Sequence, residues 1–128
     1  MGALLLPFDA AAFARRLAPL SSLREEVLYV AYLDAAGLFR GDELLTNGNE
    51  QRLTGAYRSL FERAFQYSAR SIILAHNHPS GSAVPSHKDI QTTRRLQALG
   101  RPMEIELVDH FVVGARSILS MRSAGFIG

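Results

Sequence analysis

The stretch that decides the fold runs from residue 71 to residue 89 and reads SIILAHNHPSGSAVPSHKD. Its opening segment, Ser71–Ala75, is a short apolar run of the kind found in a central strand that is covered on both faces. The segment His76–Pro85 is rich in Pro, Gly and Ser and predicts a loop. Ligand sites in sheets with helices on their faces tend to lie where a central strand ends, which here is His76.

The rest of the chain alternates between predicted helices and strands. Capping residues and periodicity predict a first helix that Asp9 caps and that runs to about Leu17 before Pro19, and a later helix that Ser86 caps and that runs to about Leu99 before Gly100 and Pro102. A third helix is predicted over 53–68, between these two. The predicted strands cover 27–33, 38–46, 71–75, 103–113 and a short stretch within 117–128, with a turn over 34–37 and a loop over 47–49. Strands separated by helices imply an α/β fold, a mixed sheet with helices packed on its faces.

The helix predicted over 53–68 carries an apolar face with the i, i+3, i+4, i+7 spacing of an amphipathic helix. These positions are interpreted as core: Leu53, Tyr57, Leu60, Phe61, Ala64 and Phe65.

The length and composition indicate one globular domain. The chain has 128 residues, 48% of them hydrophobic and 20% charged, which argues against disorder. We expect residues 1–21 to form an N-terminal helical extension of a single domain over 1–128. No run approaches the roughly 20 apolar residues that span a bilayer, and the start lacks a basic signal-peptide region. We therefore expect a cytoplasmic protein with no membrane partner.

The absence of cysteine limits the chemistry. With 0 Cys and 4 His, the sequence excludes disulfides, thiolate zinc sites, iron–sulfur clusters and a cysteine nucleophile. Any metal must therefore be held by His, Asp or Glu. The net charge of +2 is small, so contact with nucleic acid is possible but is not indicated by charge.

The pattern His76-x-His78 followed by Asp89 has the spacing of a metal site. Side chains two residues apart at a strand end point the same way, and Asp89 lies one turn into the next helix. Two His and one carboxylate leave the fourth position of Zn²⁺ open for water, as in a catalytic site. Each residue also has a structural interpretation, because Ser86-x-x-Asp89 is a capping box as well. The three residues together favour a metal site over separate structural roles for each of them.

Other polar residues are less decisive. Glu26 opens the first core strand and is a candidate proton acceptor, although Glu25 or Glu43 would serve equally on spacing alone. We expect His87 to be exposed. The pair 109–110, Asp-His, is polar inside an apolar strand, and it either orients a ligand of the metal or marks a bulge.

These residues resemble a known family. The pattern formed by His76, His78, Pro79, Ser86 and Asp89 is similar to the JAMM (MPN-plus) motif of JAB-type zinc metalloproteases. Longer strings are similar to the bacterial RadC family: ILAHNHPSG over 73–81, VDHFVVG over 108–114, REEV over 24–27 and YLD over 32–34. The resemblance covers about residues 22–128. The segment over 47–59 is less typical, and residues 1–21 are too short for the helix–hairpin–helix region that usually precedes this domain.

The resemblance implies a three-layer α/β/α fold with a mixed sheet, of the cytidine-deaminase-like (JAB/MPN) type. It also implies that His76, His78 and Asp89 are zinc ligands. Under the same resemblance Glu26 is the general acid/base that acts through the zinc water. Ser86 then stabilises the oxyanion of the tetrahedral intermediate.

Three functions follow as hypotheses. The first is a zinc-dependent hydrolase of JAMM type that cleaves a peptide or isopeptide bond in an unknown protein or peptide substrate. The second is a metal-dependent nuclease or DNA-processing protein associated with DNA repair. The third is a metal-bearing interaction module without turnover. A zinc deaminase is excluded because its signature needs cysteines. Exposed apolar edges of so small a sheet favour a homodimer.

Overall fold

The computed structural model describes residues 10–46 and 57–128. The elements, in chain order, are α1 (Ala10–Leu17), the 3-10 helix η1 (Ala18–Ser22), β1 (Val27–Leu33), β2 (Phe39–Thr46), α2 (Tyr57–Gln66), β3 (Ser71–Asn77), α3 (His87–Gly100), β4 (Glu106–Val113) and β5 (Ile118–Ser120). The Asp9 cap, the loop over 47–49 and the start of the helix at Leu53 lie outside the described residues. No helix in the described part of the chain is long and apolar enough to cross a membrane.

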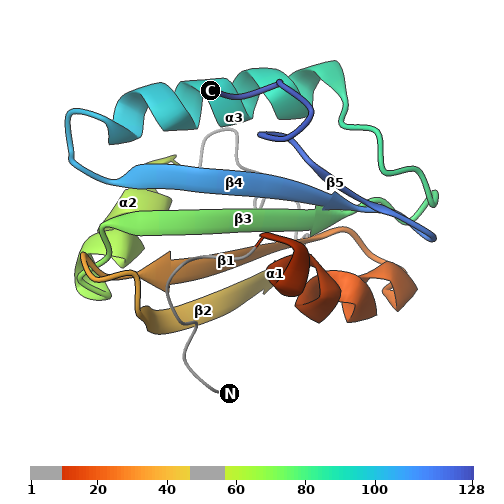
Figure 1. The fold of residues 1–128 in the computed structure, drawn as a ribbon, viewed down its shortest axis with the longest axis horizontal. Coiled ribbons are helices and arrows are strands. Elements are labelled where there is room, and N and C mark those ends of the chain that lie inside the picture. The colour runs from red at the N-terminus through yellow and green to blue at the C-terminus, as the bar shows by residue number, and fades with distance from the viewer. Residues whose placement is uncertain (1–9, 47–56) are drawn as a thin grey trace.

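The strands form one mixed sheet of five strands in the order β2-β1-β3-β4-β5 (Figure 1). Only β3 and β4 run parallel among these neighbours, and the other pairs are antiparallel. One core cluster joins α2 and α3 to one face of the sheet, and a second joins α1 to the other face. The α/β fold predicted from the sequence, with a mixed sheet and helices on both faces, is confirmed.

The central strand β3 carries the buried core on both faces. Ile72 and Leu74 pack into the cluster beneath α2 and α3, whereas Ile73 and Ala75 pack into the cluster beneath α1. Side chains alternate along a strand, so His76 follows Leu74 onto the face that α3 covers.

The strand β3 is longer than predicted, and the predicted loop start at His76 is wrong. His76 pairs with Leu28 of β1 and with Val112 of β4, and Asn77 pairs with Val113. Backbone pairing on both sides therefore keeps these polar residues in the strand, where both are buried.

The strand predicted over 103–113 starts later than expected. The backbone amides of Met103 and Ile105 both donate to the carbonyl of Gly100, at 3.1 and 2.9 Å, and Glu104 adopts a left-handed φ of 58°. This turn after α3 uses the amides that a strand would need, so pairing with β3 begins only at Glu106.

Phe65 is a second difference from the prediction. It was expected in the core but is 56% exposed, whereas Leu60, Phe61 and Ala64 of the same helix are buried. A turn of 100° per residue puts Phe65 at the margin of the apolar face, beyond the reach of the sheet.

Gly114 lets the loop after β3 approach the end of β4. A Cβ at this position would lie 2.7 Å from the carbonyl oxygen of Gly81 and 2.8 Å from the amide nitrogen of Ala83. The amide of Ala115 donates to the same Gly81 oxygen at 2.9 Å, and the amide of His78 donates to Val113 at 3.0 Å. The loop over 78–83 is thus anchored to β4 by its backbone.

Replacing Gly114 should therefore destabilise the protein. In Gly114→Ala the new methyl group collides with backbone atoms that cannot move without breaking these hydrogen bonds, and we expect the free energy of unfolding to fall by about 1–3 kcal/mol. Urea denaturation followed by circular dichroism measures it. The control is Gly128→Ala, because nothing lies within 4 Å of a Cβ there. Equal stability of the two variants would contradict the close approach.

Candidate metal site

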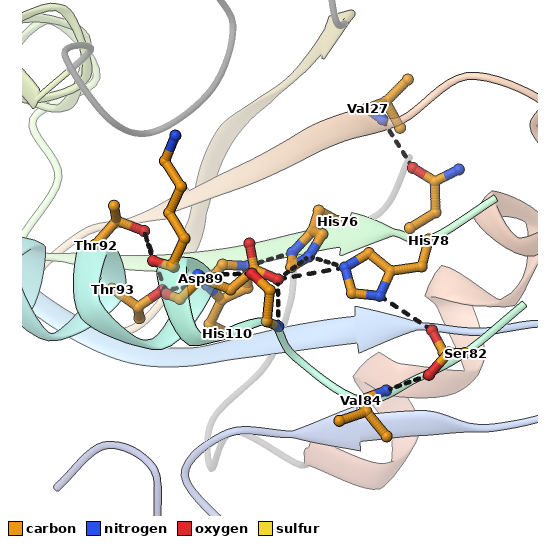
Figure 2. A network of polar contacts seen from close by, with 12 residues as sticks. Val27, His76, His78, Ser82, Val84, Asp89, Thr92, Thr93 and His110 are labelled. Carbon is orange, nitrogen blue, oxygen red and sulfur yellow. Dashed lines mark hydrogen bonds and ion pairs between the residues drawn. The ribbon is translucent and has the colours of Figure 1, made fainter. Parts of the chain in front are cut away.

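Three side chains from the end of β3 and the start of α3 converge on one point (Figure 2). The Nε2 atoms of His76 and His78 lie 2.9 Å apart. The Oδ2 atom of Asp89 lies 3.3 Å from each of these nitrogens. His76 is 5% exposed, while His78 and Asp89 are half-buried, so one side of the cluster remains open to solvent.

Asp89 is held in place by the start of α3. The amide of Asp89 donates to the Ser86 hydroxyl, and the amide of Ser86 donates back to Asp89 Oδ2, both at 2.9 Å. This is the predicted capping box, and it is confirmed. Burial raises the pKa of the Asp89 carboxyl, but its interactions with His76 and with the amide and the hydroxyl of Ser86 outweigh burial and hold that pKa well below its ordinary value of 3.8. The carboxylate therefore stays ionised.

Glu26 lies close to the two imidazoles of this cluster. One carboxylate oxygen of Glu26 and one ring nitrogen each of His76 and His78 lie within 4.8 Å of one another, an arrangement that could hold a metal ion. The structure does not bring the other two candidate acids into this group. Glu25 is exposed, and the Glu43 carboxylate accepts from Tyr32 at 3.0 Å and pairs with Arg63.

Asn77 ties the segment around Glu26 to the end of β3. Its Oδ1 accepts from the amide of Val27 at 2.7 Å, and its Nδ2 donates to the carbonyl of Glu25 at 2.9 Å. A longer contact of 3.4 Å reaches the carbonyl of Leu23. The buried amide thus binds the backbone on both sides of Glu26. This role of Asn77 could not be identified from the sequence, because the partners are some 50 residues away.

His110 lies behind His76, in the core. Its Nε2 is 2.7 Å from His76 Nδ1, and its Nδ1 is 2.8 Å from the hydroxyl of Thr93 on α3. Burial holds the pKa of His110 well below its ordinary value of 6.5. Thr93 could not be identified from the sequence, since a threonine inside a helix carries no signal of its own.

The pair 109–110 follows directly after a bulge, and its histidine contacts His76. The register between β3 and β4 shifts between Leu107 and Asp109, so Val108 is a bulge. Asp109 is buried and accepts a hydrogen bond from the amide of His110. It also accepts from the hydroxyl of Ser120 in β5 and from the amide of Arg122 just after β5, which ties β4 to this end of the chain. His110, one residue on, contacts His76. His87 is exposed, as expected.

The fold and the cluster define a mixed α/β domain with a group of His and carboxylate side chains at the end of its central strand. Comparison with protein families matches a RadC-like JAB domain over residues 7–126. The chain therefore belongs to the RadC-like JAB domain family.

Three curated relatives illustrate the similarity. A UPF0758 protein of Staphylococcus carnosus is 37% identical over 120 residues, which is 94% of this chain and 52% of the relative. One of Enterococcus faecalis is 35% identical over 112 residues, 88% of this chain and 48% of the relative. One of Vibrio vulnificus is 42% identical over 103 residues, 80% of this chain and 46% of the relative. The chain thus spans about half the length of these relatives.

Removal of the Asn77 amide should destabilise the protein. Asn77→Ala leaves the amide of Val27 and the carbonyl of Glu25 without their partner, and we expect a loss of about 2–3 kcal/mol in the free energy of unfolding by urea denaturation. Asn77→Asp is the isosteric comparison: it keeps an acceptor for Val27 but sets an oxygen against the Glu25 carbonyl. Stability of Asn77→Asp equal to that of the parent would show that the contacts of Nδ2 contribute nothing.

Proposed function

We propose that this domain is a zinc-dependent hydrolase of JAMM type, in which an activated water attacks a peptide or isopeptide bond. The observation that carries the proposal is the convergence of two imidazole nitrogens and one carboxylate oxygen within 3.3 Å of one another. Glu26 lies beside the two imidazoles, and one side of the cluster is open to solvent.

The distances among the three donor atoms fit tetrahedral zinc. Zinc–nitrogen and zinc–oxygen bonds of 2.0–2.2 Å separate neighbouring ligand atoms by about 3.3 Å in a tetrahedron. The distances among His76, His78 and Asp89 are 2.9, 3.3 and 3.3 Å. The set of donors, two imidazoles and a carboxylate, is also that of a catalytic rather than a structural zinc site.

The hydrogen bonding of His78 supports a cation at this point. Its Nδ1 lies 3.1 Å from the carbonyl oxygen of Ser82. A carbonyl only accepts hydrogen bonds, so Nδ1 carries the hydrogen and Nε2 of the neutral ring carries a lone pair. That lone pair faces the ionised Asp89 carboxylate at 3.3 Å. Two electron-rich atoms that face each other at this distance are stabilised by a positive charge between them.

Each polar group near the cluster has a distinct task in this mechanism. Zinc held there would lower the pKa of a water from 15.7 to about 7 and polarise the substrate carbonyl. The Glu26 carboxylate accepts the proton of the attacking water and returns it to the leaving amine. The Ser86 hydroxyl uses its lone pair for the Asp89 amide, so its hydrogen can donate to the oxyanion of the tetrahedral intermediate.

Metal analysis tests the ligand set. Purified protein should bind about one zinc ion per chain, and the double variant His76→Ala/Asp89→Ala should bind none, because a single imidazole remains. Inductively coupled plasma mass spectrometry measures the ratio. His87→Ala is the matched control, since it removes an exposed histidine two residues before Asp89 and should leave the zinc content unchanged. Stoichiometric zinc in the double variant would refute these ligands.

Activity tests Glu26 separately. Glu26→Gln should bind zinc as the parent does but hydrolyse substrate more slowly by roughly 10²–10⁴-fold, the usual contribution of a general base. Glu25→Gln is the control and should retain the parent rate. Rates are measured with a fluorogenic peptide library and with a peptide coupled through a lysine ε-amine.

Equal rates for Glu26→Gln and the parent would remove Glu26 from the mechanism. Zinc-dependent cleavage of single- or double-stranded DNA, with no cleavage of either peptide probe, would replace the proposed function with the nuclease.

A further inference from the structure

We propose that His110 and Thr93 are positioning residues for the metal site. Two consecutive hydrogen bonds hold His76 in the tautomer with its hydrogen on Nδ1, so that Nε2 presents a lone pair toward His78 and Asp89. The role in metal binding rests on the zinc site proposed above, whereas the tautomer is a property of the protein alone. The chain of hydrogen bonds is drawn in Figure 2.

A backbone carbonyl determines which group donates and which accepts in each of these hydrogen bonds. The Thr93 hydroxyl lies 2.6 Å from the carbonyl oxygen of Asp89, one helical turn earlier. A carbonyl cannot donate, so the single hydroxyl hydrogen of Thr93 is used in this bond. Toward His110 Nδ1, at 2.8 Å, Thr93 can therefore only accept. It follows that His110 carries a hydrogen on Nδ1.

The burial of His110 determines that its Nε2 is a hydrogen-bond acceptor. The residue is 3% exposed, and the contacts of its ring nitrogens are to Thr93 and His76, neither of which is an anion. An imidazolium in such surroundings is unfavourable, so the ring is neutral. A neutral ring with its hydrogen on Nδ1 has a lone pair on Nε2. His110 is thus an acceptor toward His76.

These two hydrogen bonds determine that His76 carries a hydrogen on Nδ1. Its Nδ1 lies 2.7 Å from the acceptor Nε2 of His110 and must donate to it. In the other tautomer two lone pairs would face each other at this distance in the core, and neither nitrogen would have a hydrogen bond. Nε2 of His76 is therefore the ring nitrogen that faces His78 and Asp89, and its lone pair is available to a cation bound there.

The chain of contacts also joins two of the proposed ligands. It begins at the ring of His76 on β3, passes through His110 on β4 and Thr93 on α3, and ends at the backbone of Asp89. The Asp89 carboxylate then lies 3.3 Å from His76 Nε2. The same contacts that orient the imidazole hold the helix that carries the carboxylate, so a change at His110 or Thr93 disturbs both.

The tautomers can be observed directly in metal-free protein. With 4 His in the chain, ¹⁵N-histidine labelling and correlation of the ring nitrogens with the carbon-bound ring protons resolve each residue. We expect a hydrogen on Nδ1 of both His76 and His110. An Nδ1 without a hydrogen in either ring overturns the proposal. Thr93→Val should leave His110 as a mixture of tautomers, while Thr93→Ser restores the parent spectrum.

Zinc affinity tests the consequence for the site. In competition with a chromophoric chelator, His110→Phe and Thr93→Val should bind zinc more weakly by roughly 10–100-fold, the usual effect of removing a hydrogen bond that orients a metal-binding histidine. Thr93→Ser should bind as tightly as the parent, because its hydroxyl can make both contacts.

Tyr32→Phe controls for a general loss of stability. It removes a buried hydroxyl from β1 that bonds to Glu43 at 3.0 Å, away from the cluster, and should not change zinc affinity.

The two proposals fail in different ways. If the parent protein binds no zinc, the proposed function fails, and the tautomers alone decide whether His110 positions His76. If the parent binds zinc and both variants bind it as tightly, the positioning role is overturned while the zinc site stands. Should His110→Phe not fold, Thr93→Val and the spectrum of the parent still give the decision.

Discussion

The pairing of β3 with β1 on one side and with β4 on the other is the constraint on which the rest of the site depends. His76 pairs with Leu28 and with Val112, so its backbone is fixed from both sides. Alternation then sends His76 toward α3 and Asn77 toward the opposite face, where its amide binds the backbone around Glu26. Two adjacent residues of β3 thereby fix two parts of the site: His76 places its own imidazole, and Asn77 holds the segment that carries the Glu26 carboxylate.

The part of the site that could be predicted from the sequence is the part encoded by short spacing. His76, His78, Ser86 and Asp89 lie within one strand end, one loop and one helical turn, and local geometry is enough to bring them together. His110 could not be assigned in the same way. Its contact with His76 depends on a parallel register that contains a bulge at Val108, and shifting that register by one residue would turn the imidazole to the other face of the sheet.

The errors in the predicted elements have the same origin. Proline and glycine after His76 indicate a loop, but backbone pairing with both neighbours extends β3 to Asn77. The alternation of Met103 and Ile105 indicates a strand, but their amides already bond to Gly100. The predicted bounds of β1, Val27–Leu33, agree with the observed ones. Its continuous apolar run lies in the middle of the sheet, where no turn competes for its backbone amides. Local pattern gives the type of element, and long-range pairing gives its ends.

The two interpretations of Asp89, helix cap and metal ligand, compete in the sequence but not in the structure. A carboxylate oxygen has two lone pairs, and Oδ2 accepts from the Ser86 amide at 2.9 Å while it faces the imidazoles at 3.3 Å. The cap fixes the rotamer when α3 folds, so little side-chain entropy remains to be lost when a cation binds. The ionised state is already stabilised by the first turn of the helix. Capping would therefore prepare Asp89 for ligation in the proposed zinc site, and a substitution at Ser86 would act on both roles.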